Sequence, residues 1–141
     1  MSLFVTFWMA LGATVALLGV DLYTGLAGKR AAHVVSVLLT VVGLVTAIVL
    51  AVKLGGDVTF QPGIQLVHRT LARSVVVLLV PIAASGGLIL FRESARARPF
   101  HRRAAFLLLG VAVAALATGV WMYGTAAPRR AIAEVPAVGS R

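Results

Sequence analysis

The stretch AAHVVSVLLTVVGLVTAIVLAV, residues 31–52, decides the class of fold. It contains no Asp, Glu, Lys or Arg, and it is as long as the roughly 20 apolar residues that a helix needs to cross a bilayer. Three further runs of this kind occupy residues 3–20, 74–91 and 104–124. An open sheet cannot satisfy its backbone hydrogen bonds in lipid, so all four runs predict membrane-spanning helices.

The composition of the whole chain agrees with this interpretation. It is 60% hydrophobic and 12% charged, with a mean hydropathy of +1.02, and a soluble protein of 141 residues could not bury that much apolar surface. Short connections between the runs favour an all-α integral membrane fold, with four transmembrane helices in an up-down-up-down bundle. We expect spans of about 3–26, 31–53, 67–92 and 100–124, within a transmembrane domain 1–126 that precedes an extended polar tail, 127–141.

The net charge of +9 is carried by short segments that flank the apolar runs. That distribution is typical of contacts with lipid headgroups and of topology signals, and it argues against nucleic-acid binding. The side reached after the first helix holds the larger number of bases. These are Lys29, Arg30, Arg92, Arg96, Arg98, Arg102 and Arg103. The positive-inside rule therefore predicts a multi-pass protein of the bacterial inner membrane with both termini on the outer side.

Several functional classes have no support in the sequence. The chain has no cysteine, which excludes disulfides, iron–sulfur clusters and thiolate metal sites. It has neither a zinc motif such as HExxH nor a phosphate-binding glycine loop, and its acids and histidines form no nucleophile–base pattern. The first run has no basic n-region and no cleavage site, so we expect a retained helix. An electron-transfer or assembly role is favoured over a self-contained catalyst.

The three histidines, His33, His68 and His101, each stand where a basic stretch meets an apolar run. A stripe of mostly small residues at helical spacing follows each one and is expected to face the interior of the bundle. The stripes are His33, Ser36, Thr40, Gly43, Ala47 and Ala51; His68, Ala72, Val76, Leu79, Ala83 and Gly87; and His101, Ala105, Leu108, Ala112, Ala115, Gly119 and Met122.

Two interpretations of these stripes stay open. Small residues allow close helix packing, and a histidine at the membrane interface is often a headgroup contact. The alternative is a groove for haem b, with His33 and His101 as ligands of the iron. Arg102 and Arg103 would then pair with the propionates, and Lys29 and Arg30 could do the same beside His33. Copper is a weaker candidate.

Two further positions are of interest. His68 has no histidine partner on its side of the membrane, so it would form a second site, for which Met9 or Met122 could supply the other ligand. Asp21 is the acid nearest to a span, and it is either a proton or cation site or a partner of Lys29 or Arg30. Pro81 is expected to kink the third helix.

From residue 28 to about 125 the order of features resembles a family of small four-helix bacterial membrane proteins. The segments of this sequence that carry the resemblance are GGDVTFQPG (55–63), VHRTLARSVVVLLVP (67–81) and HRRAAFLLLGVAVAALATGVWMYG (101–124). Some members are linked to maturation of haem-copper oxidases. The resemblance implies that His33, His68 and His101 handle haem or copper, with Phe60 and Gly63 in the turn. HR at helix starts and TG near the far end are also similar to four-helix b-type cytochromes generally.

The sequence departs from that family at two places. Histidines expected at the start and end of the second helix are replaced by Ala32 and by VKLGG (52–56), and an aromatic cluster of the fourth helix is replaced by LLGVAVA (108–114). Three hypotheses follow. The favoured one is a haem-binding or haem-handling protein of a respiratory or electron-transfer complex, in electron transport or oxidase assembly. The second is a cofactor-free accessory subunit bound to a larger membrane complex, and the third is a small transporter based on Asp21.

Overall fold

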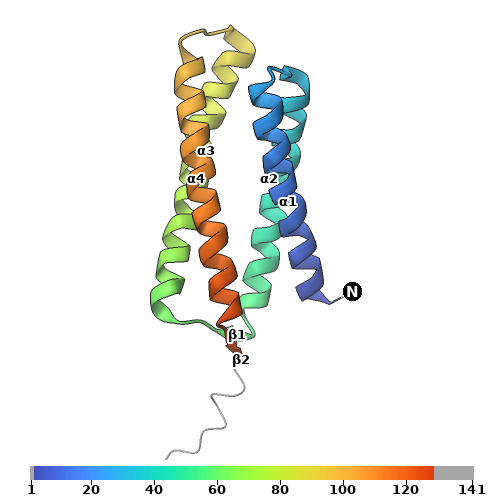
Figure 1. Ribbon diagram of the computed structural model, residues 1–141, viewed down its shortest axis with the longest axis vertical. Coiled ribbons are helices and arrows are strands. Elements are labelled where there is room, and N and C mark those ends of the chain that lie inside the picture. Colours follow the sequence, from blue (N-terminus) through green and yellow to red (C-terminus); the bar gives the residue numbers. More distant parts are fainter. Residues whose placement is uncertain (1, 129–141) are drawn as a thin grey trace, which may run out of the picture. The chain divides into compact units, whose positions relative to one another are not determined.

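The structure is a computed structural model that describes residues 2–128. In this part of the chain it contains four long helices, α1 (Leu3–Leu26), α2 (Arg30–Gly55), α3 (Pro62–Arg92) and α4 (Ala97–Gly124) (Figure 1). Each is long and apolar enough to cross a membrane, with a mean hydropathy of 2.1 to 2.8 over its window of 18 residues. The prediction of an all-α membrane fold with four transmembrane helices is therefore confirmed.

The helices pair as two antiparallel hairpins. α1 packs against α2, and α3 packs against α4. The chain divides into two compact units between Val58 and Thr59, one hairpin in each. Each hairpin closes through a short turn, and in each turn one residue adopts a left-handed backbone conformation. These residues are Gly28, with φ 68°, and Glu93, with φ 49°.

Prolines set two of the helix starts. α3 begins at Pro62, earlier than the predicted start at 67, because the segment that we expected to form a turn is the first turn of the helix. Proline suits the first helical position, where its fixed φ is helical and no N–H is needed. Pro99 lies in the first turn of α4, while Pro81 lies inside α3.

The predicted small-residue stripe of α2 is its packed face. Ser36, Thr40 and Ala47 are buried, and a Cβ added to Gly43 would lie 2.7 Å from Thr14 Oγ1 of α1. The stripe of α4 is likewise buried or half-buried throughout, with Ala115 and Met122 as its buried members. The two hairpins are thus built by close approach of backbones, as expected of helices in lipid.

The predicted stripe of α3 is wrong at two positions. Val76 is 51% exposed and Ala83 is also exposed, whereas Val75 and Ser85 are buried. Two successive steps of four residues, from His68 to Ala72 and on to Val76, exceed two turns of a helix with 3.6 residues per turn. The predicted position therefore rotates away from the contact with α4. The buried residue at this level is Val75, one position earlier.

Two short strands lie outside the helices. β1 (Val58–Thr59) and β2 (Ala127–Pro128) form a two-stranded sheet. The first two residues of the segment predicted as a tail are therefore part of a strand. Residues 129–141, the rest of that segment, lie outside the described residues.

Candidate functional site

His33 lies in the first turns of α2, and its ring rests on Gly25 of α1. A Cβ added to Gly25 would lie 3.2 Å from His33 Cε1, so the ring uses the space that the missing side chain leaves. His33 Nδ1 is 3.0 Å from the backbone carbonyl oxygen of Asp21 and 3.3 Å from Thr24 Oγ1. The ring is thereby held against the end of the neighbouring helix.

His68 makes the same contact in the second hairpin, from α3 to α4. A Cβ added to Gly119 would lie only 2.9 Å from His68 Cε1. His68 Nδ1 is 3.0 Å from the backbone carbonyl oxygen of Ala115 and 3.3 Å from Thr118 Oγ1. The contact is tighter than at Gly25, so a larger residue here would have to displace the His68 ring.

His101 repeats the arrangement at the other end of this hairpin, from α4 to α3. A Cβ added to Gly86 would lie 3.3 Å from His101 Cε1, and His101 Nδ1 is 3.0 Å from Ser85 Oγ. Each histidine therefore rests on a glycine that directly follows a serine or threonine. We call this arrangement a histidine corner. The three corners are His33 with Thr24–Gly25, His68 with Thr118–Gly119, and His101 with Ser85–Gly86.

The hydroxyl residues and glycines of the corners were missed by the sequence analysis as partners of the histidines. The signal was present, because the chain has only three places where Ser or Thr directly precedes Gly, and each of them lies against one of the three histidines. Finding the pairs from the sequence requires the register of the two helices in each hairpin.

The hydrogen bonds fix the tautomer of two of the rings. A backbone carbonyl oxygen can only accept, so Nδ1 of His33 and of His68 must carry the proton that it donates. Thr24 Oγ1 donates to the carbonyl oxygen of Val20 at 2.8 Å, which leaves its lone pairs free to accept from His33. In the neutral ring, the lone pair then lies on Nε2, the nitrogen through which such a histidine binds a metal.

The second nitrogen of these two rings is open to the surroundings. Among residues 2–128, Nε2 of His33 and Nε2 of His68 have no hydrogen-bond partner, and neither is a buried unpartnered atom. Both side chains are half-buried. In the neutral ring, the corners of His33 and His68 therefore present an accessible Nε2 lone pair at the surface of their hairpins.

Asp21 lies beside the His33 corner and takes neither of its expected lysine or arginine partners. Its Oδ2 accepts a hydrogen bond from Thr40 Oγ1 at 2.7 Å, and its Oδ1 is the one buried side-chain N or O atom in the described residues without a partner. Lys29 instead lies over the ring of Tyr23, with Nζ 4.9 Å from the ring centroid. The carboxyl group is held by the hairpin and not by an ion pair at the interface.

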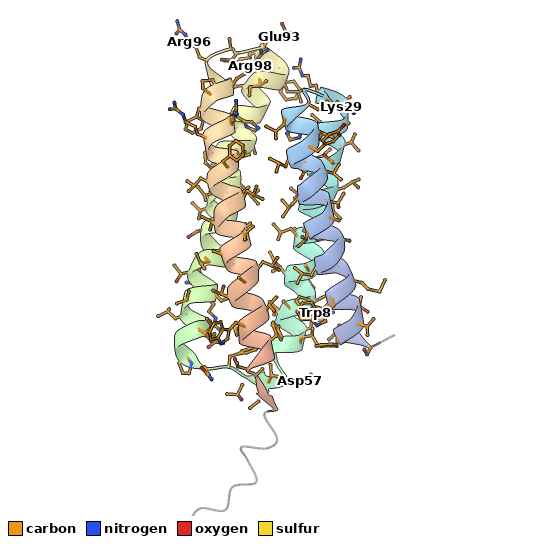
Figure 2. All side chains as sticks on the ribbon, in the orientation of Figure 1. Trp8, Lys29, Asp57, Glu93, Arg96 and Arg98 are labelled. Atoms are coloured by element: carbon orange, nitrogen blue, oxygen red, sulfur yellow. The ribbon has the colours of Figure 1, made fainter. Side chains whose placement is uncertain are left out.

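Arginines surround the His101 corner. Arg102 and Arg103 are exposed, and the Arg102 guanidinium lies 5.9 Å from the centroid of the Phe106 ring. Figure 2 shows Arg96 and Arg98, with Glu93, at the α3–α4 turn that leads into this corner. The second hairpin therefore has a strongly basic end next to one of its histidines.

The predicted site residues are distributed over both hairpins. His33 belongs to the first, while His68 and His101 belong to the second and lie at its opposite ends, near Gly119 and Gly86. Of the proposed methionine partners of His68, Met122 is buried and Met9 is 60% exposed. The described residues contain no group of three or more His, Cys, Asp or Glu side chains that could hold a metal ion.

One member of the turn in the family resemblance has a defined contact. Phe60 packs edge-on against Tyr123, with 5.2 Å between ring centroids, whereas a Cβ on Gly63 would meet nothing within 4 Å.

No protein-family model, curated protein or solved structure matches the chain.

Proposed function

We propose that the protein is a haem-binding or haem-handling membrane protein of a respiratory or electron-transfer complex in the bacterial inner membrane. His33 and His101 would be ligands of the iron of haem b, and His68 would serve a second site. One observation carries the proposal. His33 and His68 hold Nδ1 in a hydrogen bond to a backbone carbonyl and leave the Nε2 lone pair accessible, which is the usual arrangement of a histidine that binds a metal.

The residues of the chain fit this group in chemical character. The carbonyl oxygens of Asp21 and Ala115 orient the imidazoles by accepting a hydrogen bond from Nδ1 of His33 and His68. The exposed guanidinium groups of Arg102 and Arg103 suit the propionate carboxylates, to which arginine can bind bidentately. Bound haem would supply one-electron chemistry, either for electron transport or as cargo during oxidase assembly.

The test is the visible spectrum of the protein purified in mild detergent from cells supplied with haem, recorded oxidised and after reduction. We expect a Soret band with sharp reduced α and β bands. His33→Ala and His101→Ala should each abolish or shift these bands, while Lys53→Ala, an exposed cation at the far end of α2, should leave them unchanged. A featureless spectrum of the folded wild-type protein would overturn the proposal.

A cofactor-free accessory subunit is the second candidate. The observation in its favour is that the histidine corners also give interhelical hydrogen bonds and close packing without any ligand. In that case the protein should co-purify with partner subunits in a fixed stoichiometry, and His68→Ala should lower thermal stability with no spectral counterpart. Isolation as a stable lone monomer would count against it.

A further inference from the structure

The contact faces of the two hairpins follow the same residue pattern. Adding one constant to the residue numbers of the buried positions of α1 gives contact positions of α3. This offset pairs Phe7 with His68, Thr14 with Val75, and Thr24 with Ser85. All three members of the first set are buried, as are Val75 and Ser85, while His68 is half-buried in its corner.

α2 and α4 are related in the same way by another constant difference. It pairs Arg30 with Arg98, His33 with His101, and the buried Ala47 with the buried Ala115. The first difference also pairs Gly25 with Gly86. The corner of His33 with Thr24–Gly25 is therefore equivalent, residue by residue, to the corner of His101 with Ser85–Gly86.

The third corner has an altered counterpart. His68 and Thr118–Gly119 of the second hairpin correspond to Phe7 and Leu50–Ala51 of the first. Every functional part has changed, since the imidazole is replaced by a buried phenyl ring, the hydroxyl by a leucine and the glycine by an alanine.

The three replacements fit one another physically. A Cβ at Gly119 would lie 2.9 Å from His68 Cε1, so an alanine at the equivalent position excludes an imidazole seated in that way. The side chain of Leu50 has no oxygen that could take the place of Thr118 Oγ1 beside the ring. The other acceptor is kept in the first hairpin. It is the backbone carbonyl oxygen of Ala47, which corresponds to the Ala115 carbonyl oxygen that accepts a hydrogen bond from His68 Nδ1.

We infer that the hairpins α1–α2 and α3–α4 are two copies of one unit that presents a histidine at each end, and that the corner of Phe7 with Leu50–Ala51 is a fourth imidazole site, closed by these three replacements. Reopened, it would offer what the corners of His33 and His68 offer in the neutral ring, an Nε2 lone pair for a transition-metal centre. This inference does not depend on the proposed function, because it concerns the seating of the ring and not the ligand.

The direct test reopens the site with the variant Phe7→His, Leu50→Thr, Ala51→Gly. Nitrogen NMR of histidine-labelled protein in detergent, without haem or metal, should show a fourth imidazole with the proton on Nδ1, as for His33 and His68. The control is Phe7→His alone, which keeps Ala51 and should show a fourth ring without that tautomer. A fourth ring with the proton on Nε2 or in fast tautomer exchange in the triple variant would overturn the inference.

The reciprocal test closes the third corner, so that the question is decided even when the first variant fails to fold. His68→Phe combined with Thr118→Leu and Gly119→Ala reproduces the first hairpin at this position. The triple variant should keep the wild-type melting temperature, whereas His68→Phe alone and Gly119→Ala alone should each lower it. A triple variant no more stable than His68→Phe alone would show that the two corners are not equivalent.

Discussion

At the scale of single residues, the three histidine corners combine a steric and an electrostatic requirement. The ring needs the space above a glycine, and its Nδ1 needs an acceptor on the opposing helix. Within a bilayer the acceptor is valuable, because little water is available to replace it. In the corners of His33 and His68, the glycine and the carbonyl acceptor lie one turn apart on one helix, so both requirements are met only in one register of the hairpin.

Gly119→Ala tests the steric requirement. The new Cβ would lie 2.9 Å from His68 Cε1 and should displace the ring, with loss of its bond to Ala115. Overpacking costs about 1–3 kcal/mol and the lost hydrogen bond about 1 kcal/mol, while alanine regains up to about 1 kcal/mol of helix propensity. We expect a net loss of about 1–3 kcal/mol in reversible unfolding in detergent.

The matched control is Gly110→Ala in the same helix, where a Cβ would meet nothing within 4 Å. It should be neutral or stabilise the protein by up to about 1 kcal/mol. Equal effects of the two substitutions would mean that the His68 ring does not depend on Gly119.

Thr40→Val tests the bond to Asp21. The substitution keeps the shape of the side chain but removes the hydroxyl that donates to Asp21 Oδ2, leaving both carboxyl oxygens without a partner. A loss of about 1–3 kcal/mol in unfolding free energy is expected. Thr46→Val on the same helix is the control, because Thr46 is exposed and its hydroxyl donates only to the backbone carbonyl oxygen of Val42. This substitution should change the unfolding free energy by less than about 0.5 kcal/mol.

The sequence predicts the histidines of the corners but not what they touch. Their position between basic and apolar segments can be recognised from the sequence alone, and so can the small-residue stripe of α2. The partners of His68 are 47 and 50 residues away in the chain, and which turn of α4 faces α3 depends on loop length and helix starts. An error of one residue, as at Val76, is enough to miss them.

At the scale of elements, α3 differs most from its prediction. It starts at Pro62 and continues past Pro81 as one helix of 31 residues. Apolar content identifies the membrane-spanning part of a helix but not the polar turns beyond it, so the helix α3 begins before the span predicted from residue 67. The kink expected at Pro81 stays a prediction.

Pro81→Ala should stabilise the second hairpin. Alanine restores the N–H that can donate to the carbonyl of the preceding turn, and the difference in helix propensity, about 3 kcal/mol, sets the upper limit of the gain. Pro62→Ala should have little effect, because the first helical position needs no donor. Thermal unfolding followed by circular dichroism measures both. A lower melting temperature for Pro81→Ala would indicate that the hairpin requires the distortion.

At the scale of the whole molecule, the natural absence of cysteine makes the membrane topology directly measurable. Single cysteines at Ala27 and Ala95, in the two hairpin turns, should react with a membrane-impermeant maleimide only when the cytoplasmic side is accessible. A cysteine at Asp57, in the connection between the hairpins, should react from the outer side. Labelling of all three from one side would contradict four membrane spans.

The antiparallel pairing of α3 with α4 has one more consequence. His68 rests near the start of α3 and His101 rests on Gly86 near its end, so the two imidazoles are separated by about 27 Å along the helix axis, from the rise of 1.5 Å per residue. The hydrocarbon layer of a bilayer is about 30 Å thick. One iron atom cannot be bound by both rings, and this single hairpin carries an imidazole near each of its two ends.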